Sequence, residues 1–456
     1  MPNPDSGTAN PVESWRPFSS ASFSCESRYL DPERGEVRLA YRLDGMALVE
    51  VFRLPWSGRV SPARAQAVEA ALDLLHWTAA ISYWKAGCPA HFHFGQRSPD
   101  RWQADWLRRL YLEGLGEFAW RNGLDLEARV SIVGAGPAAP SAPRLGLSQQ
   151  RALVPLGGGK DSLVALERAR RLDGMEVETV QVGQAALICQ VATATGCRHW
   201  IVERKLDRRL NLLNRAGAWN GHVPVTAINA AALVVAALVG DFAYVVFANE
   251  RSADEATLID PAGHPVNHQF SKSFAFECML DDWVRRYIAT DLRVFSLLRR
   301  DRELGVCRAF AALDRYHGVF SSCNRNFHLD GAATPRWCGQ CPKCHFVALA
   351  MAPFLAPEAL AQMFGCNLLD APDQVSGFRA LLALDGVKPF ECVGEAQEAR
   401  AALMRLSRDP RWSQMTVVRA LAPLVDDDAT PPLEVLCQPG GPDRIPEAFR
   451  ASAADT

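Results

Sequence analysis

A glycine-rich run joins an apolar stretch to a helical pattern near residue 160. The apolar stretch covers residues 152–156, glycines occupy positions 157–159, and Lys160-Asp161-Ser162 opens a pattern with apolar residues on one face. Glycine backbones can turn their N–H groups toward an anion, and the N-terminus of a following helix adds the positive end of its dipole. The run therefore predicts a strand, a phosphate-binding loop and a helix.

Two well-known phosphate loops do not fit this run. A Walker loop has Ser or Thr directly after Gly-Lys, where this chain has Asp161, and the dinucleotide fingerprint has a glycine where Ser162 stands. The run instead resembles the Ser-Gly-Gly-x-Asp-Ser loop of the PP-loop ATP pyrophosphatase superfamily at five of six positions, with Gly157 in place of the serine. The resemblance implies ATP cleavage to AMP and diphosphate, with ATP bound at Gly157, Gly158, Gly159, Lys160, Asp161 and Ser162. The structural alternative is an ordinary glycine-rich turn.

Strands and helices alternate after this point. Strands are predicted at 152–156, 177–182, 199–203 and 243–248, with helices at 162–172, 184–195 and 223–239. Near-continuous apolar strands indicate a parallel sheet covered on both faces, so we expect an α/β, doubly wound fold. The resemblance of the glycine loop implies that this fold is of the PP-loop (adenine nucleotide alpha hydrolase-like) type. Ligands of such sheets bind beyond the carboxyl ends of the strands, which places Glu250 near the glycine loop.

The composition changes along the chain, and these changes predict its domains. Strands over 37–43 and 48–52 precede two helices, one beginning at Ser61-Pro62 and one over about 102–120. A segment rich in Pro and Ala follows and reads as a linker. We expect a disordered N-terminus (1–20), an α+β domain (21–133), the linker (134–146), the ATP-binding domain (147–310), a four-cysteine module (311–360) and a mainly helical C-terminal region (361–456).

Charge and hydropathy limit the environment and partners of the chain. The 456 residues carry a net charge of −2 with no basic run, which argues against a nucleic-acid partner. The apolar run 227–248 is interrupted by polar residues, so a buried helix and strand are favoured over a membrane span. The N-terminal sequence shows no signal peptide. The 13 cysteines are an odd number, which does not suggest a framework of disulfides. We expect a cytoplasmic protein without a membrane partner; the sequence sets no oligomeric state.

Four cysteines form a second chemical signature. Cys323, Cys338, Cys341 and Cys344 have the spacing C-x14-C-x2-C-x2-C. Four thiolates suit a structural Zn²⁺, because a catalytic zinc keeps an open coordination position. An iron–sulfur cluster and unligated redox thiols are the alternatives. A similar cluster follows the ATP domain in PP-loop enzymes that build deazaguanine nitriles.

Several stretches together resemble one family. They lie at 82–86, 111–124, 157–162, 217–227, 266–272, 320–328 and 388–395, together with the four cysteines. They are similar to the ATP-dependent UDP-N-acetylmuramoyl-L-alanyl-L-glutamate epimerases of bacterial peptidoglycan synthesis, over roughly residues 20–450, and that family itself carries glycine at the first loop position. The resemblance implies an ATP- and Mg²⁺-dependent conversion of the terminal L-glutamate to D-glutamate, with the UDP-linked muramoyl dipeptide as the small-molecule partner.

The chemistry is reasonable on physical grounds. The Cα–H of a glutamate is a very weak acid, because its carbanion lies beside the ionised α-carboxylate. Transfer of AMP to that carboxylate removes the charge, so that the proton can leave and return on the opposite face before hydrolysis releases AMP. Lys160 and Mg²⁺ would neutralise phosphate charge, Asp161 would contact the metal or the ribose side, and Ser162 would donate to phosphate.

Several polar side chains are candidates for moving the proton, and each has a structural alternative. His222 comes first, although it could cap its helix; Glu250 could bind ribose, Lys272 could pair with the UDP phosphates, and Cys392 could be a core residue. The proton-transfer candidates are His222, His268, Lys272, Glu250 and Cys392. The substrate-binding candidates are Lys85, Glu117, Arg121, Asn220, Asn324 and Arg325. Tyr83 and Trp120 have apolar neighbours at helical spacing and are predicted to be core residues.

Two other functions remain open. The first keeps the ATP chemistry and changes the acceptor, as in a ligase, an amidotransferase or a deazaguanine- or nucleobase-modifying enzyme. The second is a nucleotide-sensing zinc protein, which would bind ATP without forming AMP.

Overall fold

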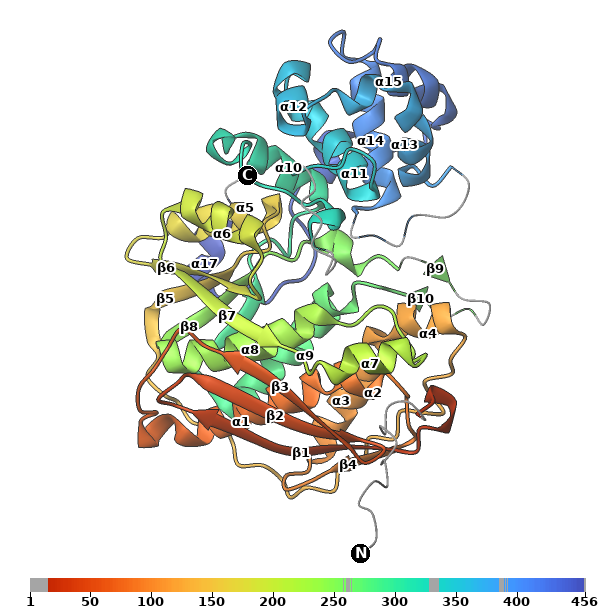
Figure 1. Ribbon diagram of the computed structural model, residues 1–456. Helices are drawn as coiled ribbons and strands as arrows, with labels where there is room; N and C mark the ends of the chain where they lie inside the picture. Colours follow the sequence, from red (N-terminus) through yellow and green to blue (C-terminus); the bar gives the residue numbers. More distant parts are fainter. Residues whose placement is uncertain are drawn as a thin grey trace, which may run out of the picture. The chain divides into compact units, whose positions relative to one another are not determined.

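The computed structural model describes most of the chain (Figure 1). The described residues are 15–256, 258–259, 263, 265–327, 336–384, 389, 391 and 393–454. They form two compact units that are not continuous in sequence. The described residues of unit 1 lie within the ranges 15–146, 202–240 and 282–291, and those of unit 2 lie within 147–201, 241–281 and 292–454. The first division falls after Gly146, the last residue of the expected linker.

Unit 1 contains an antiparallel sheet and helices. Its strands are β1 (Ser22–Asp31), β2 (Glu36–Leu43), β3 (Met46–Arg53) and β4 (His91–Phe94). Its helices are α1 (Pro62–Ala79), α2 (Ile81–Trp84), α3 (Arg101–Gly114), α4 (Gly116–Asn122), α7 (Arg209–Arg215) and α8 (Val225–Gly240), with the π-helical turn η4 (Val284–Ile288). In β2, Val37, Leu39, Tyr41 and Leu43 are buried in strict alternation, as expected for a strand with one face on a core.

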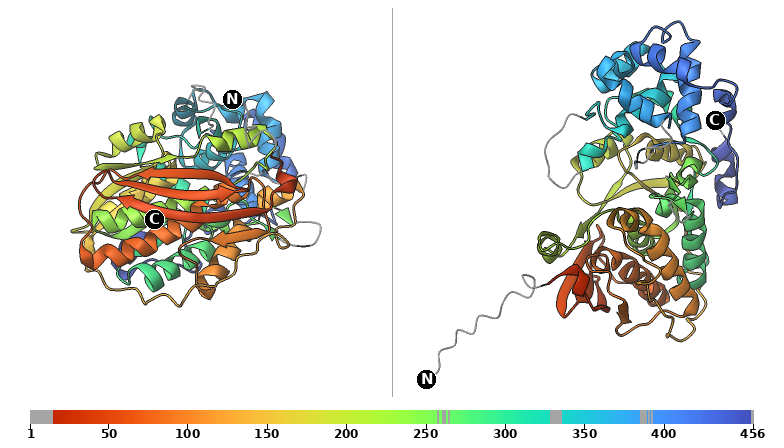
Figure 2. Two further views of the ribbon diagram at one scale, coloured as in Figure 1. Left: turned by 60° about the horizontal axis from the view of Figure 1, so that its bottom comes forward. Right: turned by 90° about the vertical axis from the view of Figure 1, so that its right-hand side faces the viewer.

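The sheet of unit 1 is built by hairpins. β2 pairs antiparallel with β1 and β3 (Figures 1 and 2, red strands), and β1 also pairs with β4 in parallel. The last residues of β7 (His199–Lys205) pair antiparallel with β3, from Val51 with Lys205 to Arg53 with Glu203. α8 is apolar all round and packs on α1, so the buried helix expected near 223–239 is confirmed.

Unit 2 contains the parallel sheet. Its strands are β5 (Ser148–Pro155), β6 (Glu176–Val182), β8 (Phe242–Phe247), β11 (Arg293–Ser296) and the short pair β9 (Leu258–Ile259) and β10 (Pro265–Val266); β7 begins in this unit. β5 pairs in parallel with β6 and β8, and β8 in parallel with β11, in the order β11-β8-β5-β6. The carboxyl ends of these strands therefore lie at one edge.

Helices complete unit 2, and those between residues 342 and 436 pack on one another (Figures 1 and 2, blue helices). The last helix, over residues 447–454, packs instead on the helix over residues 160–170. The helices are α5 (Lys160–Arg170), α6 (Ala186–Thr195), α9 (Phe274–Trp283, which ends in unit 1), α10 (Glu303–Ala311), α11 (Pro342–Met351), α12 (Pro357–Phe364), α13 (Val375–Leu381), α14 (Ala396–Ser407), α15 (Thr416–Leu421), α16 (Leu433–Leu436) and α17 (Glu447–Ala454). The expected βα alternation from β5 to β8 is confirmed, and α/β is the observed class.

One expected helix is divided. The pattern over 102–120 predicts a single helix, but α3 ends at Gly114 and α4 begins at Gly116, with Leu115 outside the helical region of φ and ψ. Glycine is a poor helix former, and a Cβ on Gly114 would lie 3.0 Å from Pro224. Two glycines around Leu115 therefore allow a turn that apolar periodicity does not reveal.

Candidate functional site

The glycine loop connects β5 to α5 within unit 2. Gly158 has a φ of +83°, a left-handed conformation that favours glycine. Gly159 is the N-cap of α5 and has no side chain to satisfy the first N–H groups of the helix. The Ser162 hydroxyl donates to the Gly159 carbonyl (3.0 Å) and accepts from the Gly157 N–H (3.5 Å). Strand, loop and helix follow one another as the sequence predicts, with backbone donors at the helix start.

Lys160 is buried and forms ion pairs with Asp161 and Glu303. Burial disfavours its charge, but Asp161 and Glu303 outweigh that cost and raise the pKa of Lys160 well above its usual value. Burial acts to raise the pKa of Asp161, yet the charges of Lys160, Lys343 and Lys272 lower it. Asp161 therefore remains a carboxylate, and Lys160 has two carboxylate partners in the protein.

Further carboxyl groups lie in this region. Glu250 follows β8, is buried and accepts a hydrogen bond from the Ser252 N–H. Its pKa is raised well above the usual value by burial and by the charges of Glu303, Glu398 and Asp161. Burial also raises the pKa of Glu398 to about 7, although its carboxylate accepts from Ser252 Oγ (2.7 Å). Burial and the neighbouring carboxylates thus disfavour the ionised form of Glu250.

Sequence reasoning missed Glu303 and Glu398. Glu303 opens α10, and Glu398 is the third residue of α14, where it completes a capping box with Glu395. The usual sequence signature of a capping box has Ser, Thr, Asp or Asn at the N-cap, so the spacing Glu395-x-x-Glu398 gave no clear signal for it. That Glu303 and Glu398 lie near the glycine loop depends on tertiary packing, which the spacing of residues in the sequence does not reveal.

Arg299 connects the segments that carry two other candidates. Its buried guanidinium donates from Nη1 to the Glu250 carbonyl (3.0 Å) and from Nη2 to the Lys272 carbonyl (2.8 Å). His268 is buried a few residues before Lys272. Glu250 and Lys272 are therefore on neighbouring segments, while Cys392 lies outside the described residues.

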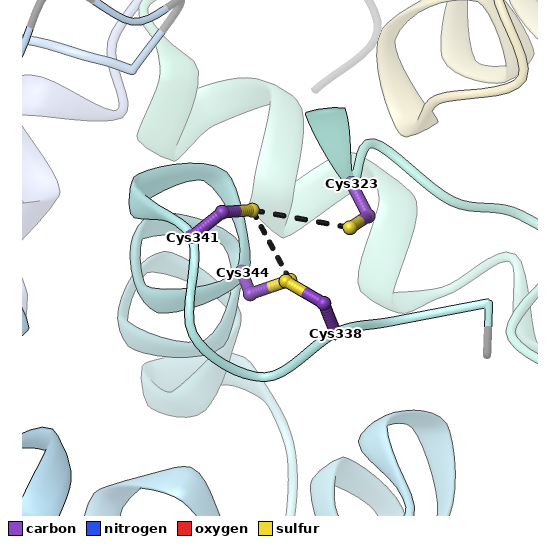
Figure 3. A group of neighbouring side chains, drawn as sticks. All are labelled: Cys323, Cys338, Cys341 and Cys344. Atoms are coloured by element: carbon purple, nitrogen blue, oxygen red, sulfur yellow. Dashed lines mark hydrogen bonds between the residues drawn. The ribbon is translucent and has the colours of Figure 1, made fainter. Parts of the chain in front are cut away.

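The four cysteines form a single cluster in unit 2 (Figure 3). The sulfur–sulfur distances are 3.9 Å for Cys323–Cys341, 3.7 Å for Cys338–Cys344 and 3.5 Å for Cys341–Cys344. Tetrahedral Zn–S bonds of about 2.3 Å place neighbouring sulfurs about 3.8 Å apart, so the thiolates fit one ion. The cluster could hold a metal such as zinc. Asn324 and Arg325 follow Cys323 in the short turn η6 (Asn324–Phe327).

Five of the predicted residues come together in unit 1. Glu117 and Arg121 share one face of α4, where Arg121 Nε donates to Glu117 Oε1 (2.6 Å). His222 Nδ1 lies 3.6 Å from the other oxygen of Glu117. His222 precedes the first residue of α8 by three positions. Its ring therefore has a carboxylate neighbour of the kind that orients histidine in proton transfer.

Lys85 belongs to the same group. Its buried Nζ donates to the Trp219 carbonyl (3.2 Å) and to Asn220 Oδ1 (3.3 Å) and lies 5.7 Å from the centre of the Phe118 ring. Burial lowers the pKa of Lys85 to about 8. The described residues place no carboxylate within ion-pair distance of its ammonium. Through this hydrogen bond to Asn220, Lys85 is connected to the segment that carries His222 two residues later.

The two aromatic expectations had different outcomes. Tyr83 is fully buried, and its hydroxyl accepts from the Asp207 N–H (3.1 Å), so it is a core residue as predicted. Trp120 is 42% exposed, so the prediction of a core position was wrong. Trp120 and the buried Phe118 are two positions apart on α4, so they point to different sides of the helix.

Within the described residues, no helix is both long and apolar enough to cross a membrane.

Two family models match the chain: the MurL N-terminal domain over residues 16–297 and the MurL C-terminal domain over residues 319–434. No solved structure matches it.

Three curated relatives match most of the chain, and each is named a UDP-N-acetyl-alpha-D-muramoyl-L-alanyl-L-glutamate epimerase. The relative from Xanthomonas oryzae pv. oryzae is 46% identical over 427 residues, which is 92% of this chain and 94% of the relative. The relative from Micromonospora sp. is 38% identical over 95% of this chain and 98% of its own length. The relative from Salinispora tropica is 38% identical over 94% of both chains.

Proposed function

The chain belongs to the MurL family, and we propose from this membership that it epimerises the glutamate of UDP-N-acetyl-alpha-D-muramoyl-L-alanyl-L-glutamate in an ATP-dependent reaction. The observation that carries the epimerase function is the 46% identity to a curated epimerase over 92% of this chain and 94% of that enzyme. The activity is that of an isomerase in peptidoglycan precursor synthesis.

In the proposed reaction, ATP adenylates the α-carboxylate of the terminal L-glutamate and releases diphosphate. The adenylate no longer carries the carboxylate charge, so the electrons of the Cα–H bond can move into an enolate as a base takes the proton. A second proton transfer to the opposite face gives the D-configured centre. Water then cleaves the mixed anhydride to the free carboxylate and AMP.

The glycine loop is the proposed ATP site, in a domain of PP-loop type over 147–310. Support comes from the strand–loop–helix order, the left-handed Gly158 and the backbone donors at the start of α5. The ionised Asp161 fits a Mg²⁺ ligand, and Mg²⁺ supplies charge neutralisation at the phosphates when bound. Lys160, whose ion pairs involve Asp161 and Glu303, would hold Asp161 in place beside the nucleotide.

His222 remains the first proposed proton-transfer group. Glu117 lies beside its Nδ1, and this neighbour supports a fixed ring orientation with imidazolium stabilised once a proton is taken. Lys85 is proposed as a substrate contact, since its buried ammonium lies beside Asn220, which is another proposed substrate contact and stands two residues before His222. Glu250, His268 and Lys272 stay the other proposed proton-transfer groups, and Asn324 and Arg325 stay proposed substrate contacts.

The four-cysteine cluster is proposed to be a structural zinc site. All four ligand positions would be filled by thiolates, and this leaves no open position for a substrate. A bound zinc ion would therefore hold together the chain segments at residues 323 and 338–344.

Product analysis tests the proposed function. The zinc-loaded protein is incubated with ATP, Mg²⁺ and the UDP-linked L-Ala-L-Glu precursor, and then hydrolysed glutamate is resolved by chirality. We expect D-glutamate together with AMP and diphosphate. Product that contains only L-glutamate would exclude an epimerase. Epimerisation without AMP would exclude the adenylation step, and amide formation with ammonia or an amine would identify a ligase or amidotransferase.

A further inference from the structure

The segment before the first cysteine lies against the glycine loop. The Ser321 N–H donates to the Gly158 carbonyl (2.9 Å), and a Cβ built on Gly159 would lie 2.6 Å from Ser322 Oγ. Glycine is therefore the only residue type that, at position 159, lets the Ser322 hydroxyl lie this close to the loop without a shift. Both contacts are made within unit 2.

Ser321 is fixed by the four-cysteine module. Its buried hydroxyl donates to the Arg336 carbonyl (2.6 Å) and accepts from the Cys323 N–H (3.0 Å) and from Asn326 Nδ2 (3.1 Å). Cys323 in turn is part of the thiol cluster. Ser321 thus links the cluster to the glycine loop, and it sets the position of Ser322 between them.

Ser322 differs from the serine of the loop. The Ser162 hydroxyl hydrogen is directed at the Gly159 carbonyl, so that donor is already engaged inside the loop. Ser322 is half-buried, and no hydrogen bond of its hydroxyl is found among the described residues. At Gly157, where the PP-loop pattern has a serine, a Cβ would meet nothing within 4 Å. The loop therefore lacks a side-chain hydroxyl at position 157. Ser322 places a hydroxyl that can donate a hydrogen bond next to the same loop.

We propose that Ser322 Oγ donates a hydrogen bond to a phosphate oxygen of ATP in the glycine loop, in place of the serine absent at Gly157. This assignment rests on the proposed ATP-dependent function. It makes the four-cysteine module part of the nucleotide site, because the backbone next to Cys323 places the donor. The charges of Lys343 and Lys272 act on Asp161, and Lys343 stands between two of the cysteines, so the module also brings a cation toward the loop.

A rescue experiment tests the assignment. ATP affinity is measured by calorimetry with Mg²⁺ on zinc-loaded wild type, Ser322→Ala, Ser322→Thr, Gly157→Ser and the double variant Gly157→Ser/Ser322→Ala. Loss of a hydrogen bond to a charged phosphate corresponds to a roughly 10-fold or greater rise in Kd for Ser322→Ala. Ser322→Thr keeps the hydroxyl and should stay within a few-fold of wild type. Gly157→Ser should recover most of the affinity in the double variant, a gain that a folding defect cannot produce.

The outcomes separate the two claims. Zinc content and circular dichroism verify that each variant is folded. Wild-type affinity in Ser322→Ala would overturn the role of Ser322 while leaving the proposed function intact. A double variant no better than Ser322→Ala would overturn the substitution of one hydroxyl for the other. A wild-type protein that does not bind ATP would overturn the proposed ATP dependence and the inference together.

Discussion

Lys85 is a buried cation whose hydrogen-bond acceptors are the neutral oxygens of Trp219 and Asn220. An uncompensated buried ammonium costs stability, and natural chains retain such groups mainly where chemistry needs them. The sequence singled out Lys85 only through a resemblance, since an isolated lysine carries no pattern. Its lowered pKa follows from burial, which becomes visible only in the folded chain.

Replacement of Lys85 should separate stability from activity. The folded pKa of about 8 lies below the usual 10.5, so the unfolded chain binds more protons between these values and stability rises with pH across this window. Lys85→Met should abolish that rise, add up to about 3 kcal/mol at pH 7 and reduce epimerisation. Urea unfolding of both proteins from pH 7 to 10.5 measures the effect. Parallel pH dependences for wild type and variant would contradict a perturbed Lys85.

Glu117 is a second residue whose role depends on its neighbour. Glu117→Gln removes the negative charge beside His222 Nδ1, and we expect exchange of the glutamate Cα proton to slow by roughly 10- to 100-fold while ATP affinity is unchanged. Glu113→Gln is the matched control, since Glu113 forms a similar i,i+4 pair with Arg109 but is exposed. Equal exchange rates in Glu117→Gln and the control would exclude an orienting role for Glu117.

At the scale of elements, the sequence predicted strands and helices well where apolar periodicity was strong. β5, α5, β6, α6 and β8 lie within a few residues of their expected positions. The division of α3 from α4 was missed because two glycines interrupt a pattern that is otherwise continuous. The cysteine spacing predicted a cluster correctly, since its pattern is local at three of four positions.

Metal removal tests the role assigned to the four-cysteine cluster. One zinc per chain is expected by elemental analysis, and chelation should lower the melting temperature by at least about 5 °C, because binding to the folded state alone stabilises it. Cys341→Ser should reproduce the loss. Cys366→Ser is the control, because Cys366 is exposed and stands outside the cluster. A melting temperature that does not respond to chelation would argue against a structural metal.

At the scale of the whole molecule, the two compact units are discontinuous in sequence. Residues 202–240 and 282–291 pack with residues 15–146, although their place in the sequence predicts that they belong to the ATP-binding domain. The apolar sequence of α8 predicts that it is buried, but nothing local specifies that α1 covers it. Long-range packing of this kind is the part of the fold that sequence patterns did not supply.

In the proposed reaction of the whole enzyme, one ATP is converted to AMP for each inversion at the glutamate Cα. The most direct measurement is the reaction in deuterium oxide with ATP, Mg²⁺ and the UDP-linked L-Ala-L-Glu precursor, followed by mass and chiral analysis of glutamate. We expect D-glutamate that carries deuterium at Cα, an equal amount of AMP, and no exchange when ATP is omitted. D-glutamate without deuterium, or deuterium exchange in the absence of ATP, would contradict it.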